Sequence, residues 1–475
     1  MKTVTAEYKD SMESAFRSQS EVRITIIQSS GNIVFESDSI SNMTQTTDID
    51  PISRRLPTET LEFSVLDTEG TYNPVAPSSE WEGIDANAEI LLEYGYQLGN
   101  NTVWLSSDSY VLSGKPTYSK GIALFKANKK LATLTGTFYK GAFTSSSYTY
   151  EALAIQVLAD AGLSSSEYVL DDYLSSYNSS APIPIDTHKN CLQMIAHACG
   201  CALYTDSNGK ITIKHIIFFA LTPLDFHLTR RDIVRGTEET NKLSPIYKTE
   251  AYKYSYYETE TEAKEVYRET ITTTDTTDYH IEFEAAKNVI VNVNGSEISA
   301  NVYAQSADFT LVGSGETTII ATGYPVKENS SVYTKLVSSD SSGGIDTMKN
   351  PIVTDYSVCA ILAENTALYL QYRNTNYLSY RGNPELQALD CIYYTDGFGT
   401  LLKALVLKNT IKFNGALSGE LILKNLSEID GAELYDSLDE IVYDNTDEAI
   451  MTTEPKKILA NYTTAQINQF IGEVI

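Results

Sequence analysis

The feature that most constrains the fold of this chain is a series of short runs in which apolar and polar residues alternate. Val22, Ile24 and Ile26 share one face, with polar residues between them, and this period of two indicates a strand with one buried face. Similar runs lie at 61–67, 88–96, 108–115 and 122–134. Turn residues such as Asn73-Pro74 separate the runs. The first 140 residues are therefore predicted to form a small β-barrel or sandwich.

Tyrosine is unusually abundant, with 33 residues against 14 phenylalanines and 2 tryptophans. Tyrosine suits a pleated surface with one wet face, and it also suits interfaces, where its hydroxyl finds a partner. β-structure is the simpler explanation, and an interface is the alternative. A hydrophobic content of 42% over 475 residues is enough for about three or four domains with cores of their own.

The charge of the chain excludes several classes of function. Lys and Arg total 35 against 62 Asp and Glu, which gives a net charge of −27. Such a surface repels nucleic acid and anionic membranes, so neither sequence-specific nucleic-acid binding nor stable membrane insertion is expected. The strongest apolar run, 216–221, is too short to span a bilayer, and the first residues lack the apolar core of a signal peptide. An odd number of cysteines, 5, in a chain made in a cytoplasm argues against a disulfide scaffold.

Two helices and a hairpin are predicted in the middle of the chain. Thr149 can cap a helix over 151–161, and a second helix is expected over 188–199. Asn208-Gly209 then lies between two alternating runs, which is a strong hairpin pattern. Residues 141–235 are therefore predicted to be a small α+β domain.

The second half of the chain returns to β-structure and carries one long helix. Asn294-Gly295 ends an alternating run and predicts another hairpin. Thr354 or Asp355 can cap a helix over about 356–373, whose apolar residues form a stripe. Further strands are predicted at 377–380, 391–394, 401–413 and 419–424.

The two ends of the chain differ from the middle. Residues 1–20 are predicted to form a short helix before the first strand. Residues 428–448 carry nine acidic residues and no basic one, which is typical of a solvated connection. The last segment is predicted to be a helix with one narrow apolar face, made of Ile467, Phe470, Ile471 and Val474. Because a short helix is marginal alone in water, this face is expected to dock on its own subunit or on another.

One cluster contains residue types that bind metals, namely His188, Cys191, His197, Cys199 and Cys201. Zinc sites usually pair close ligands with a second pair farther along the chain, whereas these five follow one helix and the start of a strand. Cys191 shares its helical face with apolar residues, and His197 falls off that face toward solvent. Packing is therefore the preferred interpretation, and no metal and no cofactor are predicted.

No motif for catalysis stands out in the sequence. Nucleophilic catalysis needs a nucleophile, a base within reach and an orienting group, and the 5 histidines lie in no such motif. Gly313-Ser314-Gly315 fits a turn rather than a phosphate loop. Carboxylates are so numerous that a glycosidase pair is not excluded by counting. No catalytic residues are predicted, and the chain is not expected to be an enzyme.

Three stretches of the chain resemble one family. Residues 380–386, Tyr-Arg-Gly-Asn-Pro-Glu-Leu, followed by Asp390-Cys391-Ile392, are similar to the RGNPxLxxGD signature of phage tail hub proteins. These are the baseplate central hubs of contractile tails and the N-terminal hub part of siphophage tail-associated tip proteins. Asn350-Pro351-Ile352 resembles the family's lead-in to a long helix, and 413–419 resembles its closing strand.

Of the other two stretches, the third is the weakest. Leu192–Ile213 is similar to the family's helix followed by a hairpin, and Arg54–Asp67 is similar to an early strand. One departure is Leu389, which occupies the position where the family usually has a glycine before Asp390.

The motif residues are expected to act structurally, and they are Arg381, Gly382, Asn383, Pro384, Asp390, Gly415 and Gly419. Gly382 can supply an unusual backbone conformation, and Pro384 keeps the residue before it extended. Arg381 is expected to donate a structural salt bridge.

The resemblance implies a mainly β fold with an α+β insert, made of two similar small β-barrel domains plus intervening α+β and β domains. Three chains would form a ring in which six barrels alternate. The implied division is 1–140 as the N-terminal β-barrel domain, 141–235 as the small α+β domain, 236–280 with 352–427 as the second β-barrel domain, 281–351 as an inserted β region, and 428–475 as the acidic connection with the C-terminal helix.

The implied function is that of a structural hub at the distal end of a phage or phage-like tail, which adapts a sixfold tube to a threefold tip and closes the tube. Expected partners are two further copies of the chain, tail tube or distal-tail ring proteins, the tape measure protein and a tip or spike protein, while DNA passes through. The expected location is the tail tip or baseplate of the virion, after assembly in the host cytoplasm. The alternatives are a distal-tail ring or receptor-binding adaptor of the baseplate, and a tail-tip cell-wall hydrolase.

Overall fold

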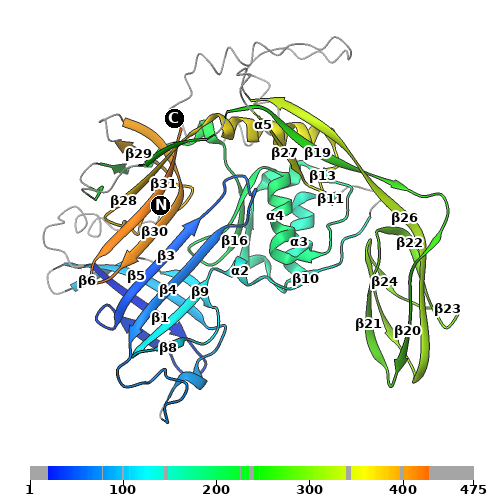
Figure 1. Cartoon of the computed structure of the whole chain (residues 1–475), viewed down its shortest axis with the longest axis horizontal. Coiled ribbons are helices and arrows are strands. Elements are labelled where there is room, and N and C mark those ends of the chain that lie inside the picture. Colours follow the sequence, from blue (N-terminus) through cyan, green and yellow to red (C-terminus); the bar gives the residue numbers. More distant parts are fainter. Residues whose placement is uncertain are drawn as a thin grey trace.

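The computed structural model describes residues 20–426 apart from 78, 99–100, 106, 144–147, 225, 230–231, 235–239, 245, 338–343 and 396–400. The helix predicted before the first strand, and everything predicted for 428–475, lie outside the described residues. The described part is mainly β with an α+β insert, so the predicted fold class is confirmed (Figure 1). Among the described helices, none is both long and apolar enough to cross a membrane.

The N-terminal β unit consists of β1 (Ser20–Ile27), β2 (Ile33–Glu36), β3 (Ile40–Asp48), β4 (Thr58–Leu66), η1 (Trp81–Gly83), β5 (Glu89–Leu98), β6 (Asn101–Trp104), β7 (Asp108–Leu112), β8 (Thr117–Ser119) and β9 (Ile122–Asn128). The main hydrogen-bonded path is β3-β4-β9-β7-β5-β1-β2. The alternating runs of the sequence are strands here. The run predicted to continue to residue 134 ends at Asn128 instead, because the chain turns at the buried Lys129 into the short helix α2 (Lys130–Thr133).

The N-terminal sheet curls around a single core. β2, at one end of the path, places Phe35 against Phe63 of β4 and Phe125 of β9, with ring centroids 5.8 and 5.5 Å apart. Phe63 and Phe125 stack on each other at 4.8 Å. Because strands from the end and the middle of the path meet in one core, the unit is barrel-like.

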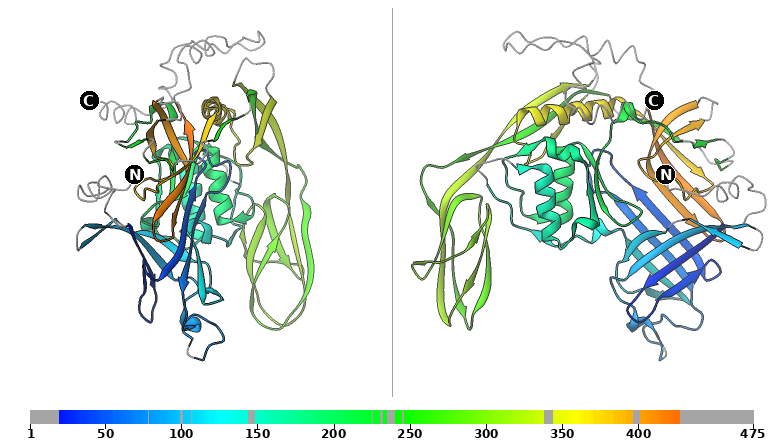
Figure 2. Two further views of the ribbon diagram at one scale, coloured as in Figure 1. Left: turned by 60° about the vertical axis from the view of Figure 1, so that its left-hand side comes forward. Right: turned by 180° about the vertical axis from the view of Figure 1, so that it is seen from behind.

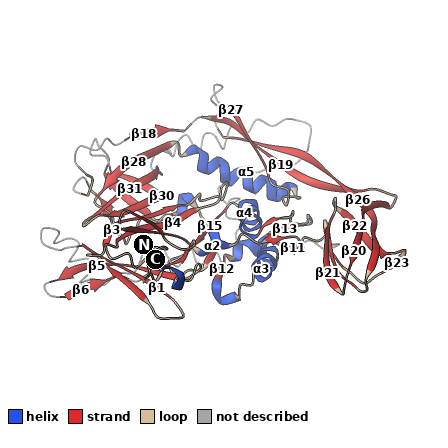
Figure 3. Ribbon diagram, turned by 60° about the horizontal axis from the view of Figure 1, so that its bottom comes forward, coloured by secondary structure: helices blue, strands red, loops and turns tan. Residues whose placement is uncertain are grey.

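The α+β domain follows with β10 (Thr137–Phe138), β11 (Tyr148–Thr149), α3 (Tyr150–Asp160), η2 (Ser165–Glu167), β12 (Tyr168–Leu170), η3 (Asp172–Ser176), β13 (Asn178–Ser179), β14 (Asp186–Thr187), α4 (His188–Ala198), β15 (Cys201–Thr205) and β16 (Ile211–His215). The predicted cap is present, since the Thr149 hydroxyl accepts from the Ala152 N–H at 3.1 Å. β15 and β16 form the predicted hairpin, and β12 pairs parallel to β16. Figure 3 shows the helices in the middle of the molecule, with β-structure on both sides.

A long ribbon leads away from the helices. β19 (Tyr247–Thr259) pairs with the second half of β26 (Gly315–Leu336), and β27 (Gly344–Lys349) pairs parallel to β19. The first half of β26 belongs to a lobe with its own core. The other strands of the lobe are β20 (Lys264–Thr273), β21 (Thr277–Glu282), β22 (Ala286–Val293), β23 (Ser296–Glu297), β24 (Asn301–Val302) and β25 (Ser306–Leu311). The lobe projects from the molecule beyond the helices (Figures 1 and 2) and contacts the rest of the chain at residues 139–141.

The strand pairing of the ribbon and the lobe differs from the predicted domain boundaries. Residues 247–280, which those boundaries assigned to the second barrel, pair within the ribbon and the lobe. These residues pair there because β26 is 22 residues long and runs through both the ribbon and the lobe. The inserted region is therefore larger than 281–351 when strands are grouped by their partners.

The C-terminal β unit consists of β17 (His227–Leu228), β18 (Thr240–Leu243), β28 (Asn374–Tyr380), β29 (Cys391–Thr395), β30 (Leu401–Phe413) and β31 (Leu417–Asn425). Its main path is β18-β28-β31-β30, with β29 on β30 and β17 on β29. Side chains from these strands fill one core. The turn η4 (Phe218–Ala220) and the helix α5 (Tyr356–Gln371) lead into the unit, and Asp355 caps α5 by accepting from the Ser357 N–H at 2.6 Å.

β30 joins the two β units. Its residues 408–413 pair with residues 43–48 of β3, and its other edge pairs with β31. Its side chains enter three different cores. Phe413 lies in the N-terminal core, Val406 in the C-terminal core, and Leu405 in a third core shared with the α+β domain. The two units therefore form one continuous sheet of 15 strands.

Gly419, opposite β30, tests how closely this sheet is packed. A Cβ at this position would lie 2.3 Å from the Tyr380 ring and 2.7 Å from the Thr410 carbonyl oxygen. Gly419→Ala is therefore expected to lower the free energy of unfolding by about 3 kcal/mol, measured by urea denaturation. Gly83→Ala is the control, because a Cβ at Gly83 meets nothing within 4 Å, and its effect should stay within about 0.5 kcal/mol. Equal losses in the two variants would contradict the close packing.

Candidate functional site

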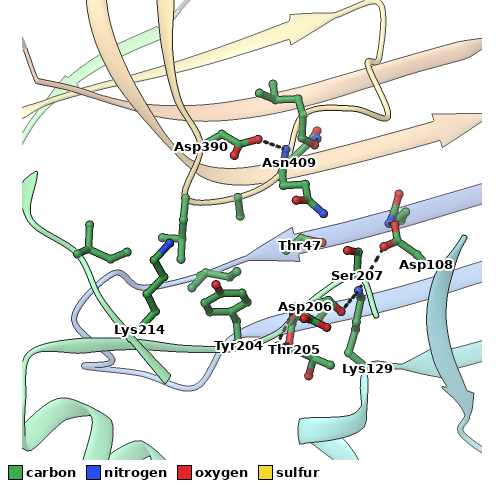
Figure 4. A pocket seen from close by; sticks show the side chains of 18 of the residues that line it. Thr47, Asp108, Lys129, Tyr204, Thr205, Asp206, Ser207, Lys214, Asp390 and Asn409 are labelled. Carbon is green, nitrogen blue, oxygen red and sulfur yellow. Dashed lines mark hydrogen bonds and ion pairs between the residues drawn. The ribbon is translucent and has the colours of Figure 1, made fainter. Parts of the chain in front are cut away.

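A cavity of about 320 Å³ lies where the N-terminal β unit, the α+β domain and the C-terminal β unit meet. Strands β3 and β4, the β15–β16 hairpin, the loop 384–390 and β30 line it (Figure 4). The size is that of a small-molecule site, but the lining carries many charged side chains, namely Glu59, Asp108, Lys129, Asp206, Lys214 and Asp390. We call this place the junction cavity.

One wall of the junction cavity is held by Ser53, a buried residue between β3 and β4. Its Oγ accepts from the Leu203 N–H at 2.9 Å and donates to the Cys201 carbonyl at 2.7 Å. Ser53 has a φ of +51°, which a non-glycine residue rarely adopts. The Asp50 carboxylate fixes this turn by accepting from the N–H groups of Ile52 and Arg54.

Glu59 of β4 makes a second contact with the edge of β15 beside that of Ser53. Its carboxylate accepts from the Thr205 N–H, with oxygens at 3.0 and 3.3 Å. Residues 201, 203 and 205 alternate along the free edge of β15, and their backbone groups would otherwise be unpaired. Side chains of the N-terminal unit thus take the place of a neighbouring strand.

Asp108 and Lys129 lie behind Glu59, and both are buried. The Lys129 Nζ lies 3.5 Å from an Asp108 carboxylate oxygen and donates to the Asp206 carbonyl at 2.9 Å. The Gln45 amide donates to the other Asp108 oxygen at 3.0 Å and to the Tyr110 hydroxyl at 2.7 Å. The network therefore ties β3, β7 and the end of β9 to the β15–β16 turn.

Burial shifts the titration of this network. Desolvation raises the pKa of Glu59 to about 7, and the nearby Asp108 charge adds to the rise, while Lys129 and the Thr205 N–H oppose it. Burial also holds the pKa of Tyr110 well above its usual value. His215, on the far side of the cavity, stacks on Tyr173 at 3.9 Å, and burial lowers its pKa to about 4.

The loop that resembles the hub signature forms the opposite wall. Gly382 has a φ of +79°, and a Cβ there would lie 2.9 Å from the Ser418 carbonyl oxygen. The Asn383 side chain accepts from the Glu385 N–H at 2.8 Å. The Asp390 carboxylate accepts from the Gln387 N–H at 2.7 Å. The loop therefore holds its own shape by local hydrogen bonds, and Pro384 lies on the cavity wall.

Leu389 keeps a glycine-like conformation although it is not glycine. Its φ is +71°, and its N–H donates to the Val406 carbonyl at 2.7 Å, while the Val406 N–H donates to the Asp390 carbonyl at 2.9 Å. The bend of the loop is thus fixed by β30. The side chain of Leu389 packs against the third core.

Arg381 was expected to donate a structural salt bridge. Its side chain is exposed, and it makes no ion pair with any residue that the structure describes. Its backbone N–H donates to the Asp232 carbonyl at 2.9 Å. The predicted salt bridge therefore stays a prediction. The two other motif glycines lie at the β30–β31 hairpin, Gly415 in its turn with a φ of +93° and Gly419 in β31.

The cluster of possible metal ligands is spread over separate contacts. His188 Nε2 lies 2.9 Å from an Asp160 carboxylate oxygen, and the Cys191 thiol faces the carbonyls of Pro184 and Asp186. Cys199 and Cys201 are buried in the same core as Cys191, and the Cys201 thiol faces the Cys199 carbonyl. In the described part of the chain, no group of three His, Cys, Asp or Glu residues is placed to hold a metal ion.

His197 was predicted to point to solvent, and this is wrong. It is buried, and its Nδ1 lies 3.2 Å from the Asn350 side-chain amide. Burial, together with the positive charge of Arg54, lowers its pKa to about 4. The helical pattern of α4 identified one packed face, but Asn350 and Tyr252 of β19 cover a second face.

The sequence pattern already marks Glu59 and Asp108 as buried charges, and we did not identify them from the sequence. Glu59 stands in phase with the buried residues Leu61 and Phe63 of β4, and Asp108 stands in phase with Tyr110 and Leu112. A charged residue on the apolar phase of a strand must find a partner inside. The pattern could have identified the buried charges, but it could not have paired them.

Comparisons with known proteins give likenesses of structure alone. No family model matches the sequence, and no curated protein does. A 43 kDa tail protein of prophage MuSo2 from Shewanella oneidensis matches with a TM-score of 0.45 at 10% identity, over 86% of this chain and 100% of that one. A tail protein from Neisseria meningitidis MC58 matches with a TM-score of 0.46 at 9% identity, over 86% and 96%.

The solved structures that this chain resembles are phage tail proteins and tail-related components. One of them is the E. coli c3393 protein, a type VI secretion component described as similar to the T4 tail proteins gp27 and gp5. It matches with a TM-score of 0.37 at 10% identity, over 82% of this chain and 74% of that one. These TM-scores lie below 0.5, so the functional proposal below is built on the residues of this chain.

Ser53 tests whether side chains support the edge of β15. Ser53→Ala leaves the buried Leu203 N–H and Cys201 carbonyl without their partner, and should lower the free energy of unfolding by about 2 kcal/mol. Ser41→Ala is the control, since the exposed Ser41 hydroxyl bonds to the Ser64 carbonyl, and it should change stability by less than about 0.5 kcal/mol. Urea denaturation measures both, and equal effects would rule out the support.

Leu389 tests the fixed bend of the loop. At a positive φ, glycine should be more stable than alanine, so Leu389→Gly is expected to exceed Leu389→Ala by about 1 kcal/mol. The exposed helical position Ile155 is the control, and there alanine should exceed glycine by about 1 kcal/mol. The same order at both positions, measured by urea denaturation, would mean that the bend is absent in solution.

Proposed function

We propose that this chain is the structural hub at the distal end of a phage or phage-like tail, which adapts a sixfold tube to a threefold tip and closes the tube. The function is mechanical, and its energy comes from subunit interfaces rather than from a reaction. The hub signature at 380–392 is the sequence support. The support from the fold is the presence of two β units with separate cores in one chain.

The observation that carries the proposal is the edge-to-edge pairing of these units. Residues 43–48 of β3 pair with 408–413 of β30, so one chain holds two β units side by side in a continuous sheet. Three such chains in a ring present six units, and a cyclic assembly repeats one contact between chains around its axis. One face of the ring can then match a sixfold tube, while the inserted parts keep threefold symmetry.

The ribbon and lobe suit contacts outside such a ring. The lobe is fastened to the α+β domain, where the Ala304 N–H donates to the Gly141 carbonyl at 2.7 Å and the Ser306 hydroxyl donates to the Tyr139 carbonyl at 2.7 Å. Its core is separate from the cores of the β units. A lobe carried on a ribbon can meet tail tube, distal-tail ring, tape measure or tip proteins without disturbing the ring.

The charge of the chain fits a channel through which DNA passes. A net charge of −27 repels the phosphate backbone, so DNA is not retained. The lumen of the trimer is expected to be lined by acidic side chains. A neutral or basic lumen would count against a role in DNA passage.

The alternatives predict different behaviour. A distal-tail ring or receptor-binding adaptor would be six-membered. A tail-tip cell-wall hydrolase would use carboxylates at a cleft, but at the junction cavity Glu59 and Asp108 are held by structural partners, the Thr205 N–H and Lys129. Clearing of peptidoglycan by the purified chain would favour the hydrolase.

Native mass spectrometry of the full chain tests the hub proposal. A trimer is expected, because two β units in each of three chains supply six positions. A hexamer would support the ring or adaptor, and a monomer at micromolar concentration would oppose both. Dilution and a rise in salt serve as controls, since an obligate interface keeps its stoichiometry while a weak association does not.

A further inference from the structure

We propose that Glu59, Asp108 and Lys129 form a proton-sensitive joint, in which one proton on Glu59 decides how firmly the edge of β15 is held to the N-terminal β unit. The joint concerns a single chain and goes beyond the hub function. It rests on three buried ionisable groups at the contact between two domains. It makes the junction cavity a conformational element rather than a ligand site.

The charge balance of the three groups requires a proton. Glu59, Asp108 and Lys129 are each 4% exposed. With all three ionised, two carboxylates would face one ammonium, and a net negative charge would be buried. A buried charge without compensation is strongly disfavoured, so one carboxylate takes up a proton instead.

The hydrogen bonds decide which carboxylate is protonated. Asp108 has a charged neighbour, Lys129 at 3.5 Å, and a neutral donor, Gln45 at 3.0 Å, and both favour its ionised form. Glu59 has only Thr205 as a hydrogen-bond partner in the described chain, through its N–H and its side chain, and both are neutral groups, while the ion pair of Lys129 is with Asp108. The proton therefore belongs on Glu59, in agreement with a pKa raised to about 7.

Three other titratable groups at the cavity, Tyr110, Tyr204 and His215, keep one charge state near neutral pH. Burial raises the pKa of Tyr110 far above this range and that of Tyr204 to about 12. His215 stays neutral, because burial lowers its pKa to about 4. The Asp206 carboxylate faces its own turn and accepts from the N–H groups of Asn208 and Lys210. The remaining charged side chains at the cavity are Lys214 and Asp390.

Asp390 is a second carboxyl at the cavity whose titration could cause a similar pH dependence. Burial raises the pKa of its carboxyl as well. It lies in the loop of the opposite wall, where it accepts from the Gln387 N–H, and the Lys214 charge of β16 opposes the rise of its pKa. A variant at Glu59 removes one titration and leaves the other, which separates the two groups.

Ionisation of Glu59 weakens the joint. The carboxylate accepts the Thr205 hydrogen bond more strongly when charged, but its burial beside Asp108 outweighs this gain, since desolvation is the largest influence on its pKa. Opening the edge of β15 exposes the carboxylate to water and returns its pKa to the ordinary 4.5. The closed joint is therefore most stable below pH 4.5 and loses this stability as the pH rises through about 7.

Hydrogen exchange of the full chain measures the joint. Exchange at residues 201–205, corrected for the intrinsic rate at each pH, reports the opening equilibrium. Between pH 5.5 and 7.5 this equilibrium should rise about twentyfold in the natural chain, since each pH unit between the two pKa values changes it by up to tenfold. In Glu59→Gln the rise should vanish, because the amide still accepts the Thr205 N–H but does not ionise.

Glu62→Gln is the matched control on the same strand. Its side chain is half exposed and pairs with Lys126 at 3.1 Å, so the twentyfold rise should remain. If Glu59→Gln keeps the rise, the proposal is overturned, and Asp390 becomes the responsible group.

A second variant keeps the proposal testable if Glu59→Gln does not fold. Asp108→Asn removes the competing carboxylate and leaves Lys129 to stabilise an ionised Glu59. The pH at which exchange rises should then fall by about one unit or more. An unchanged pH in Asp108→Asn would also overturn the proposal.

Discussion

The arrangement of the two β units depends on one strand, β30, which belongs to both of them. One edge of β30 pairs with β3 of the N-terminal unit, and its other edge pairs with β31 of the C-terminal unit. Phe413, Val406 and Leu405 enter three different cores. A shift of β30 by one residue would exchange its two faces and empty all three cores together. The relative placement of the two β units is therefore fixed by strand register rather than by surface contacts.

This constraint explains why the hub-like loop adopts strained backbone. The loop 381–390 must return from β28 to β29 while it stays hydrogen-bonded to β30. Gly382 at a φ of +79° and Leu389 at +71° make the two bends. The second bend is held by paired hydrogen bonds with Val406, so β30 imposes on a leucine a conformation that usually needs glycine. The packing of the Leu389 side chain against the third core offsets part of the strain.

Local patterns were sufficient to place most elements but not to pair them. The alternating runs gave the strands of the N-terminal unit, Thr149 gave the start of α3, and the loop 380–392 gave the resemblance to tail hubs. The partners of Ser53 and Glu59 lie about 150 residues away in the sequence, and a local pattern carries no information at this range. The prediction that His197 faces solvent was wrong for the same reason, because the residue that covers it, Asn350, is distant in sequence. The salt bridge expected for Arg381 stays a prediction, because a motif does not fix the direction of a side chain.

The edge of β15 shows why buried polar groups are used at this joint. Had a strand of the N-terminal unit paired with β15, the α+β domain would have become part of the large sheet, and its position would be rigid. Ser53 and Glu59 satisfy the same backbone groups of β15 with their side chains. Two side chains take up fewer residues than a whole strand, and they fix the position of β15 at two points. Apolar residues would pack as well, but they would leave the edge of β15 unpaired at a cost comparable to a lost hydrogen bond for each group. The carboxylate is thus required by the edge that it covers, and its response to pH follows from the burial that this role imposes.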